Sequence, residues 1–273
     1  MDERFARLPR SLQDRATTLT LGDGVPALVA LPEGDDPVPF VLWMHGRTVN
    51  KELDPGRYLR WIRAGIAAVA VDLPGHGDRF IEGSHDPERT PAVVEQMYGE
   101  IDGVLASIRD RHPRLDMTRA GIGGMSAGGM ATLRRLCDPH PFLAASIEGT
   151  TGDLIGLYFP DSSDASGHWP VQHDRAAVKR IDSSTNLSEF EPLPLLALHN
   201  EGDELVPISL QRRFLERLGE QYAARGANRD LITLWTFADT GAPMEHAGFG
   251  RFGNDAKNVQ LDFLSGVLLN GRT

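Results

Sequence analysis

The chain has 273 residues, of which 41% are hydrophobic and 24% are charged. This composition is that of an ordinary globular protein, and it excludes a disordered, collagen-like or coiled-coil chain. Acidic side chains outnumber basic ones by 38 to 28, so the formal net charge is −10. An acidic balance of this size repels phosphate backbones and anionic lipids, so we expect neither a nucleic-acid partner nor a membrane partner.

The single cysteine, Cys137, excludes an internal disulfide and a multi-cysteine metal site. It follows the apolar stretch 130–136, so we expect a buried structural thiol rather than a nucleophile. The charged first residues contain no apolar core, and the longest apolar runs are too short to cross a bilayer. We therefore expect a cytoplasmic protein.

Predicted strands and helices alternate along the chain. Residues 17–31 alternate around Gly22-Asp23-Gly24, which predicts a hairpin. Apolar runs predict further strands at 40–44, 66–71, 119–125, 142–147, 193–198 and 231–237. Helical spacing occupies residues 58–62, 91–111, the segments after Ser126 and Pro207, and about 254–269.

This alternation predicts the α/β fold class, with a mostly parallel sheet covered by helices on both faces. No repeat or linker interrupts it, so we expect one domain over residues 1–273. In such a sheet, ligands bind at the carboxyl ends of the strands.

A candidate nucleophile follows the predicted strand at 119–125. Gly124-Met125-Ser126-Ala127-Gly128 matches the pattern G-x-S-x-G between a strand and a helix. The chain turns sharply at such a serine, and only very small flanking residues let the neighbouring backbone pass. The start of the helix also offers free N–H groups. We predict Ser126 as the nucleophile, and the alternative is a glycine-rich turn with an incidental serine.

The serine needs an imidazole to take its proton and a carboxylate to orient that imidazole. In a fold of this kind, the acid and then the histidine follow the serine along the chain. His246 is the last of nine histidines and lies in a glycine-rich loop between the final predicted strand and helix. Asp203 follows the predicted strand at 193–198 and is the predicted acid, with Glu201 as the alternative.

Acyl transfer also needs two N–H donors for the developing oxyanion. We expect one from Ala127, directly after the nucleophile, and one from Arg47, which follows Gly46 at the end of the predicted strand at 40–44. Gly46 lets the backbone approach closely. A plain strand-ending turn is the alternative for this segment.

About 45 residues separate the predicted strands at 142–147 and 193–198, which is too many for one connecting helix. We expect a small cap over the nucleophile at about 150–192, with Tyr158, Phe159 and Trp169 binding the substrate. The alternative is a surface excursion whose aromatic rings pack on the sheet.

Several of these segments resemble the α/β-hydrolase superfamily, and within it the dienelactone hydrolase and prolyl-oligopeptidase-like esterases. The segments are His45-Gly46, Asp72-Leu73-Pro74-Gly75-His76-Gly77-Asp78, Gly124-Met125-Ser126-Ala127-Gly128, Gly202-Asp203, Val206-Pro207 and His246. The resemblance implies an eight-stranded, mostly parallel sheet and hydrolysis of a carboxylic ester, amide or thioester by a Ser/His/Asp triad. Asn200 stands where many of these relatives have glycine.

The sequence thus predicts a serine esterase for small or medium-sized esters, with Ser126, His246 and Asp203 as its triad. We expect no cofactor. We also expect no metal ion, because the candidate ligands His168 and His173 are suggested by nothing more than their spacing in a predicted loop. The alternatives are a small peptidase or thioesterase, a cofactor-free perhydrolase, and a non-catalytic binding protein on the same scaffold.

Overall fold

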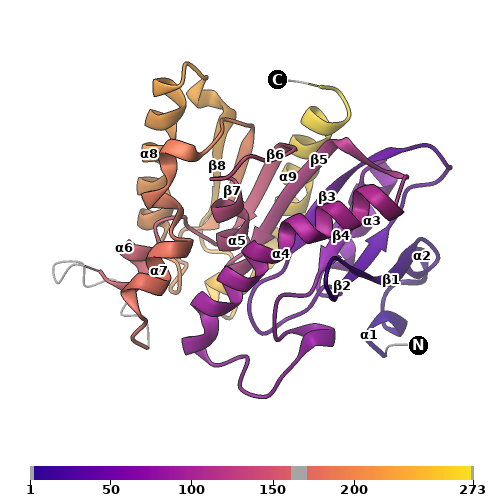
Figure 1. Cartoon of the computed structure of the whole chain (residues 1–273), viewed down its shortest axis with the longest axis horizontal. Helices are drawn as coiled ribbons and strands as arrows, with labels where there is room; N and C mark the ends of the chain where they lie inside the picture. Colours follow the sequence, from indigo (N-terminus) through magenta and orange to yellow (C-terminus); the bar gives the residue numbers. More distant parts are fainter. Residues whose placement is uncertain (1–2, 161–170, 272–273) are drawn as a thin grey trace.

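A twisted sheet runs through the molecule, with helices on both of its faces (Figure 1). The computed structural model describes residues 3–160 and 171–271. The strands of these residues are β1 (Ala16–Leu21), β2 (Val25–Ala30), β3 (Val38–Met44), β4 (Ala67–Val71), β5 (Leu115–Met125), β6 (Phe142–Glu148), β7 (Leu195–Asn200) and β8 (Ile232–Phe237).

The eight strands lie in the order β1-β2-β4-β3-β5-β6-β7-β8. Only β2 runs antiparallel to its neighbours, and every pair from β4 to β8 is parallel. The predicted mostly parallel, eight-stranded sheet is therefore confirmed.

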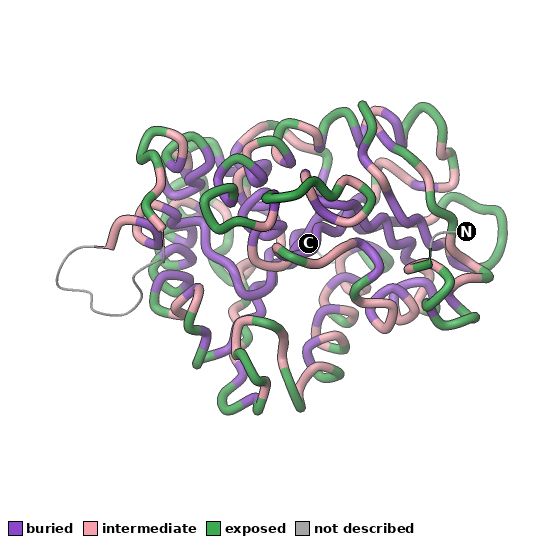
Figure 2. Tube along the Cα trace, turned by 90° about the horizontal axis from the view of Figure 1, so that it is seen from below, coloured by how far each residue is buried: buried purple, intermediate pink, exposed green. Residues whose placement is uncertain are grey.

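The helices divide between the two faces of the sheet. They are α1 (Glu3–Ala6), α2 (Arg10–Gln13), α3 (Pro55–Ala64), α4 (Thr90–Arg111), α5 (Ala127–Arg135), α6 (Leu154–Tyr158), α7 (Arg175–Ile181), α8 (Ile208–Ala224) and α9 (Gly253–Leu268). The core on one face includes residues of α4 to α8, whereas the core on the other includes residues of α2, α3 and α9. Figure 2 shows the buried strands enclosed by partly exposed helices.

Local sequence explains most of these elements. Every residue of β4 is buried, as expected for a strand covered on both faces. The predicted hairpin is confirmed, since β1 and β2 pair from Ala16↔Ala30 to Leu21↔Val25. Strand β5 is longer than predicted, because it begins at Leu115 and the polar pair Thr118-Arg119 interrupts its apolar pattern.

The parallel strands bring distant segments to one edge of the sheet. Strand β3 ends at Met44, just before Gly46, and its neighbour β5 ends directly before Ser126. Asp203 follows the end of β7, and His246 follows β8, which pairs with β7. Among the described residues, no helix is long and apolar enough to cross a membrane.

Cys137 lies just beyond α5 and is 2% exposed, so the expected buried thiol is confirmed. Burial raises the pKa of this thiol to about 12. The thiolate is the reactive form, so the thiol of the folded protein is inert at neutral pH.

We therefore expect folded protein to react very slowly with dithionitrobenzoate at pH 8, because the reagent must wait for the core to open. Absorbance at the thionitrobenzoate band measures the reaction. The same protein in guanidinium chloride is the control, and it should release one equivalent per chain. Rapid release from folded protein would contradict the buried position of Cys137.

Candidate active site

Ser126 occupies a strained turn between β5 and α5. Its backbone has φ 49° and ψ −117°, a conformation that non-glycine residues rarely adopt. Two hydrogen bonds hold it there. The Ser126 N–H donates to the Glu148 carbonyl over 2.8 Å, and the Thr150 hydroxyl donates to the Ser126 carbonyl over 2.9 Å. The chain after β6 therefore fixes the position of the serine.

The two glycines of the motif permit a very close passage of backbone. A Cβ atom on Gly124 would overlap the backbone of Gly128, and a Cβ atom on Gly128 would overlap the carbonyl of Met44. The start of α5 consequently lies directly against the end of β3, as the spacing of the glycines predicts.

The structure brings the three predicted triad residues together. His246 Nε2 lies 2.9 Å from Ser126 Oγ, and His246 Nδ1 lies 2.8 Å from Asp203 Oδ2. The side chain of Asp203 is almost fully buried, whereas that of His246 keeps a small exposed fraction. Glu201, the alternative acid, instead accepts a hydrogen bond from Thr236 on β8. The geometry thus favours Asp203.

Backbone donors hold the Asp203 carboxylate in place. Its Oδ1 accepts the N–H groups of Leu205 at 3.0 Å and Val206 at 2.8 Å. His199 donates from Nε2 to the Val206 carbonyl over 2.8 Å, and burial lowers the pKa of its imidazole. His199 is therefore a neutral packing residue that supports the turn carrying Asp203.

The predicted oxyanion donors flank the nucleophile. A Cβ atom on Gly46 would stand 3.5 Å from Ser126 Cβ, so this loop passes close to the serine. His45 Nδ1 donates to the Gly46 carbonyl over 2.6 Å, and because carbonyl and N–H point in opposite directions in a trans peptide, the Arg47 N–H is turned away from that ring. Within the described ranges, neither the Arg47 N–H nor the Ala127 N–H has an intramolecular acceptor.

The Arg47 side chain ties the same loop to the start of α4. Its guanidinium donates to the carbonyls of Ser84 at 3.3 Å and Pro87 at 3.5 Å, and to the hydroxyl of Thr90. This side-chain role was not visible in the sequence, because the partners lie about 40 residues away in a segment without a motif.

A buried ion cluster anchors the loop from the other side. The Lys51 ammonium lies 2.8 Å from Asp72, 2.5 Å from Asp78 and 2.9 Å from Glu52. Burial by itself raises the pKa of the Asp72 carboxyl, but hydrogen bonds from His45 and Lys51 outweigh it and leave the pKa below its usual value. Sequence reasoning missed Lys51, for which the only signal was the motif containing its partners Asp72 and Asp78.

The predicted substrate-binding residues lie on and after α6. Tyr158 is buried, and its ring meets the edge of His173 at 4.5 Å between centroids. Phe159 is partly buried against the core, with the Arg175 guanidinium 4.9 Å from its ring centroid. Trp169 lies outside the described residues. Among those that are described, no group of three or more His, Cys, Asp or Glu side chains could hold a metal ion.

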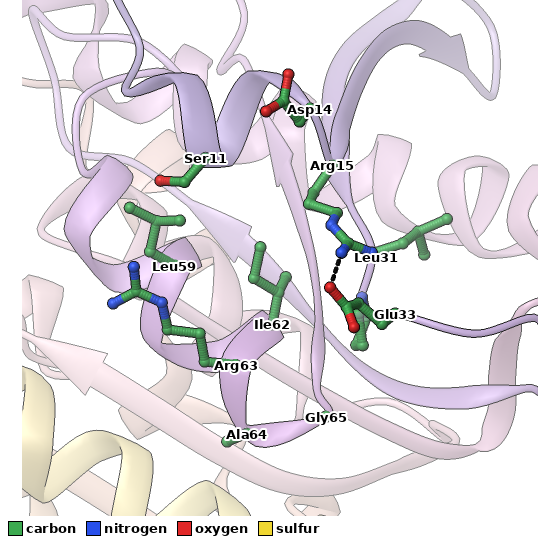
Figure 3. A pocket seen from close by; sticks show the side chains of 11 residues that line it. Ser11, Asp14, Arg15, Leu31, Glu33, Leu59, Ile62, Arg63, Ala64 and Gly65 are labelled. Carbon is green, nitrogen blue, oxygen red and sulfur yellow. Dashed lines mark hydrogen bonds and ion pairs between the residues drawn. The ribbon is translucent and has the colours of Figure 1, made fainter.

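A cavity of about 250 Å³ lies beside two of the three predicted triad residues, and its walls include Met125, Asp203 and His246. A larger cavity of about 720 Å³ lies between α2, α3 and the end of β2 (Figure 3). It reaches Gly65, just before β4, so it lies at the opposite edge of the sheet. The described residues that line it include Ser11 but no histidine, so the smaller cavity belongs to the candidate site.

The chain is similar to several known proteins. The sequence profile of the prolyl oligopeptidase family matches residues 99–267. The protein named esterase YjfP of Escherichia coli (strain K12) is 26% identical over 228 residues, which cover 77% of this chain and 86% of that protein. The putative esterase YitV of Bacillus subtilis (strain 168) is 25% identical over 197 residues, covering 68% and 76%. The crystal structure of TT1662 from Thermus thermophilus matches with a TM-score of 0.69 at 21% identity, covering 93% of this chain and 98% of that one.

The sheet order, the helices on both faces and this structural likeness define an α/β-hydrolase, which confirms the predicted fold class. Within that class, the chain belongs to the prolyl oligopeptidase family.

The ion cluster leads to a prediction about Asp72. Its pKa is lower in the folded protein than in the unfolded chain, so its ionised form stabilises the fold above the unfolded pKa, and this contribution is lost as the pH falls through the folded pKa. We expect Asp72→Asn to lower the free energy of unfolding by about 3 kcal/mol at pH 7, because Lys51 loses a buried partner. The loss should shrink below about pH 4.

Urea denaturation followed by circular dichroism at pH 7 and at pH 3.5 measures this difference. Asp262→Asn on the exposed face of α9 is the matched control, and it should change stability by less than about 0.5 kcal/mol. An equal effect of both substitutions would contradict a special role of Asp72.

Proposed function

We propose that the protein is a serine esterase that hydrolyses small or medium-sized carboxylic esters. The observation that carries this proposal is the imidazole of His246, which links the Ser126 hydroxyl at 2.9 Å to the Asp203 carboxylate at 2.8 Å. Two relatives named as esterases support an ester as the substrate, because the matched regions cover 86% and 76% of those proteins.

In the proposed mechanism Ser126 Oγ attacks the ester carbonyl while His246 Nε2 accepts its proton. The N–H groups of Arg47 and Ala127 donate hydrogen bonds to the oxyanion that forms. When the tetrahedral intermediate collapses, His246 gives the proton to the leaving alcohol. Water then attacks the acyl-enzyme with His246 as its base, and Asp203 orients the imidazole throughout.

We also propose that the segment at about 150–192 caps the nucleophile, with Tyr158 and Phe159 in the wall of the substrate pocket. Support comes from the Tyr158 hydroxyl, which lies 3.9 Å from Met130 Sδ. Met130 is one helical turn beyond Ser126 on α5, so α6 lies against the helix that carries the nucleophile.

Ser126→Ala tests the nucleophile. We expect turnover of p-nitrophenyl acetate to fall by at least about a thousandfold, because the proposed acyl-enzyme forms on Ser126 Oγ. Release of p-nitrophenol measures the activity, and thermal unfolding checks that the fold survives. Ser11→Ala, in the larger cavity of Figure 3, is the matched control and should keep full activity. Full turnover by Ser126→Ala would refute the assignment.

A peptidase is the second candidate, and the match to the prolyl oligopeptidase family favours it. Both activities would use the same triad, because an amide and an ester form similar tetrahedral intermediates. They differ in the leaving group, since an amine anion is a far poorer leaving group than an alkoxide, so cleavage of an amide depends more strongly on the proton from His246.

A comparison of p-nitrophenyl acetate with p-nitroacetanilide separates the two candidates, because the acyl group is the same in both. We expect kcat/KM for the ester to exceed that for the anilide by at least about a thousandfold, a difference of about 4 kcal/mol in the barrier. Both reactions are followed by absorbance, with Ser126→Ala as the blank. Comparable values for the two substrates would favour the peptidase.

A further inference from the structure

The cavity beside His246 has a polar wall whose charges are already paired with one another. The Arg57 guanidinium binds both oxygens of Glu148, at 2.5 and 2.9 Å, and donates to Asp54 at 3.1 Å. Lys257, at the rim, lies 3.3 Å from the same Asp54. These groups line the cavity but offer an incoming ligand no unpaired charge.

Asn200 is different, because half of its amide has no partner. Its Nδ2 group donates to the carbonyl of Glu245 and, over 2.7 Å, to the carbonyl of Gly248. Two carbonyl acceptors fix the orientation of the amide, so Oδ1 is the atom that remains. Asn200 is 3% exposed and lines the cavity, yet Oδ1 has no hydrogen-bond partner among the described residues. A buried acceptor without a donor is costly, and a ligand hydroxyl would satisfy it.

The position of the cavity identifies the part of the substrate that it would hold. His246 must protonate the oxygen of the leaving alcohol, so the alcohol departs on the side of the histidine. The cavity is bordered by His246 and by Met125, the residue before the nucleophile. Its volume of about 250 Å³ is below the usual range for ligand pockets, which suits a small alcohol.

We propose that this cavity binds the leaving alcohol of the ester, and that Asn200 Oδ1 accepts a hydrogen bond from a hydroxyl of that alcohol. The preferred substrates are then acyl esters of small polyhydroxylated alcohols. This inference rests on the proposed esterase function. In the reaction, the bond between the acyl carbon and the alcohol oxygen breaks, and that oxygen takes the proton held by His246.

Three acetates with the same acyl group test the preference in the unaltered protein. Glycerol 1-acetate carries hydroxyl donors, propyl acetate carries neither donor nor charge, and acetylcholine carries a charge without a donor. We divide kcat/KM, measured by acid release in a pH-stat, by the rate constant for alkaline hydrolysis of the same ester, which removes the difference in leaving-group reactivity. We expect this normalised value to be about threefold to tenfold higher for glycerol 1-acetate than for propyl acetate, the effect of one neutral hydrogen bond. Equal values, or a preference for acetylcholine, would overturn the inference.

Turnover of p-nitrophenyl acetate by the same sample separates this inference from the proposed function. Hydrolysis of that ester without any preference among the three acetates refutes only the alcohol site. Failure to hydrolyse it at all refutes the esterase.

Two glycines of α9 provide matched variants that block or spare the cavity. Gly253 lines it, has a helical backbone with φ −59°, and a Cβ atom there would meet nothing within 4 Å. Gly253→Leu should therefore lower kcat/KM for glycerol 1-acetate at least about threefold relative to methyl acetate. Gly266 has the same open surroundings but does not line the cavity, so Gly266→Leu should leave the ratio unchanged. The same ratio in both variants would contradict the proposed site.

Asn200→Leu tests the acceptor itself. The substitution also removes the bonds to Glu245 and Gly248, so turnover of every ester should fall. That loss cancels in the ratio of the normalised kcat/KM values for glycerol 1-acetate and propyl acetate, which should drop to about one because the acceptor is gone. A ratio that stays at the unaltered value would overturn the role of Asn200.

Discussion

The close contact between the start of α5 and the end of β3 is the constraint on which the site depends. It exists because Gly124 and Gly128 have no Cβ atoms to hold Met44 away. The contact forces Ser126 into its positive-φ turn and places the first N–H of α5 near the loop that follows β3. Backbone packing thus brings the predicted nucleophile and the two predicted oxyanion donors together.

Each loop around this contact is held by buried polar groups. The loop that contains Arg47 is held by Lys51 with Asp72 on one side and by the Arg47 guanidinium on the other. The loop of His246 is held by the amide of Asn200. The sheet supplies a rigid edge, and these networks set the loops against it, which is the arrangement that a preorganised site requires. Asn200 would then both position the histidine and contact the alcohol that this histidine protonates.

Much of this architecture was predictable from the sequence, because the signals were local. Apolar runs located the strands of the parallel sheet, Gly22-Asp23-Gly24 located the hairpin, and the glycines around Ser126 located the turn. The order of acid and histidine along the chain then selected Asp203 and His246, which the structure places in contact with each other.

The supporting networks were not predictable, because their partners are far apart in the sequence. Lys51 meets Asp72 and Asp78 only after β3 and β4 pair, and Asn200 meets Gly248 only after β8 joins the sheet. In the sequence, the only notable feature of Asn200 is that many relatives have glycine at this position. A single sequence cannot show that its amide spans two carbonyls and leaves one oxygen without a partner.

Covalent labelling with a fluorophosphonate, followed by peptide mass spectrometry, tests the central claim most directly. A serine activated by His246 and Asp203 attacks phosphorus as it attacks an ester carbonyl. We predict one label per chain, on the peptide that contains Ser126, with loss of esterase activity in proportion to the label. Esterase activity that survives complete labelling, active protein that the reagent fails to label, or a label on another serine would contradict the assignment of Ser126 as the nucleophile.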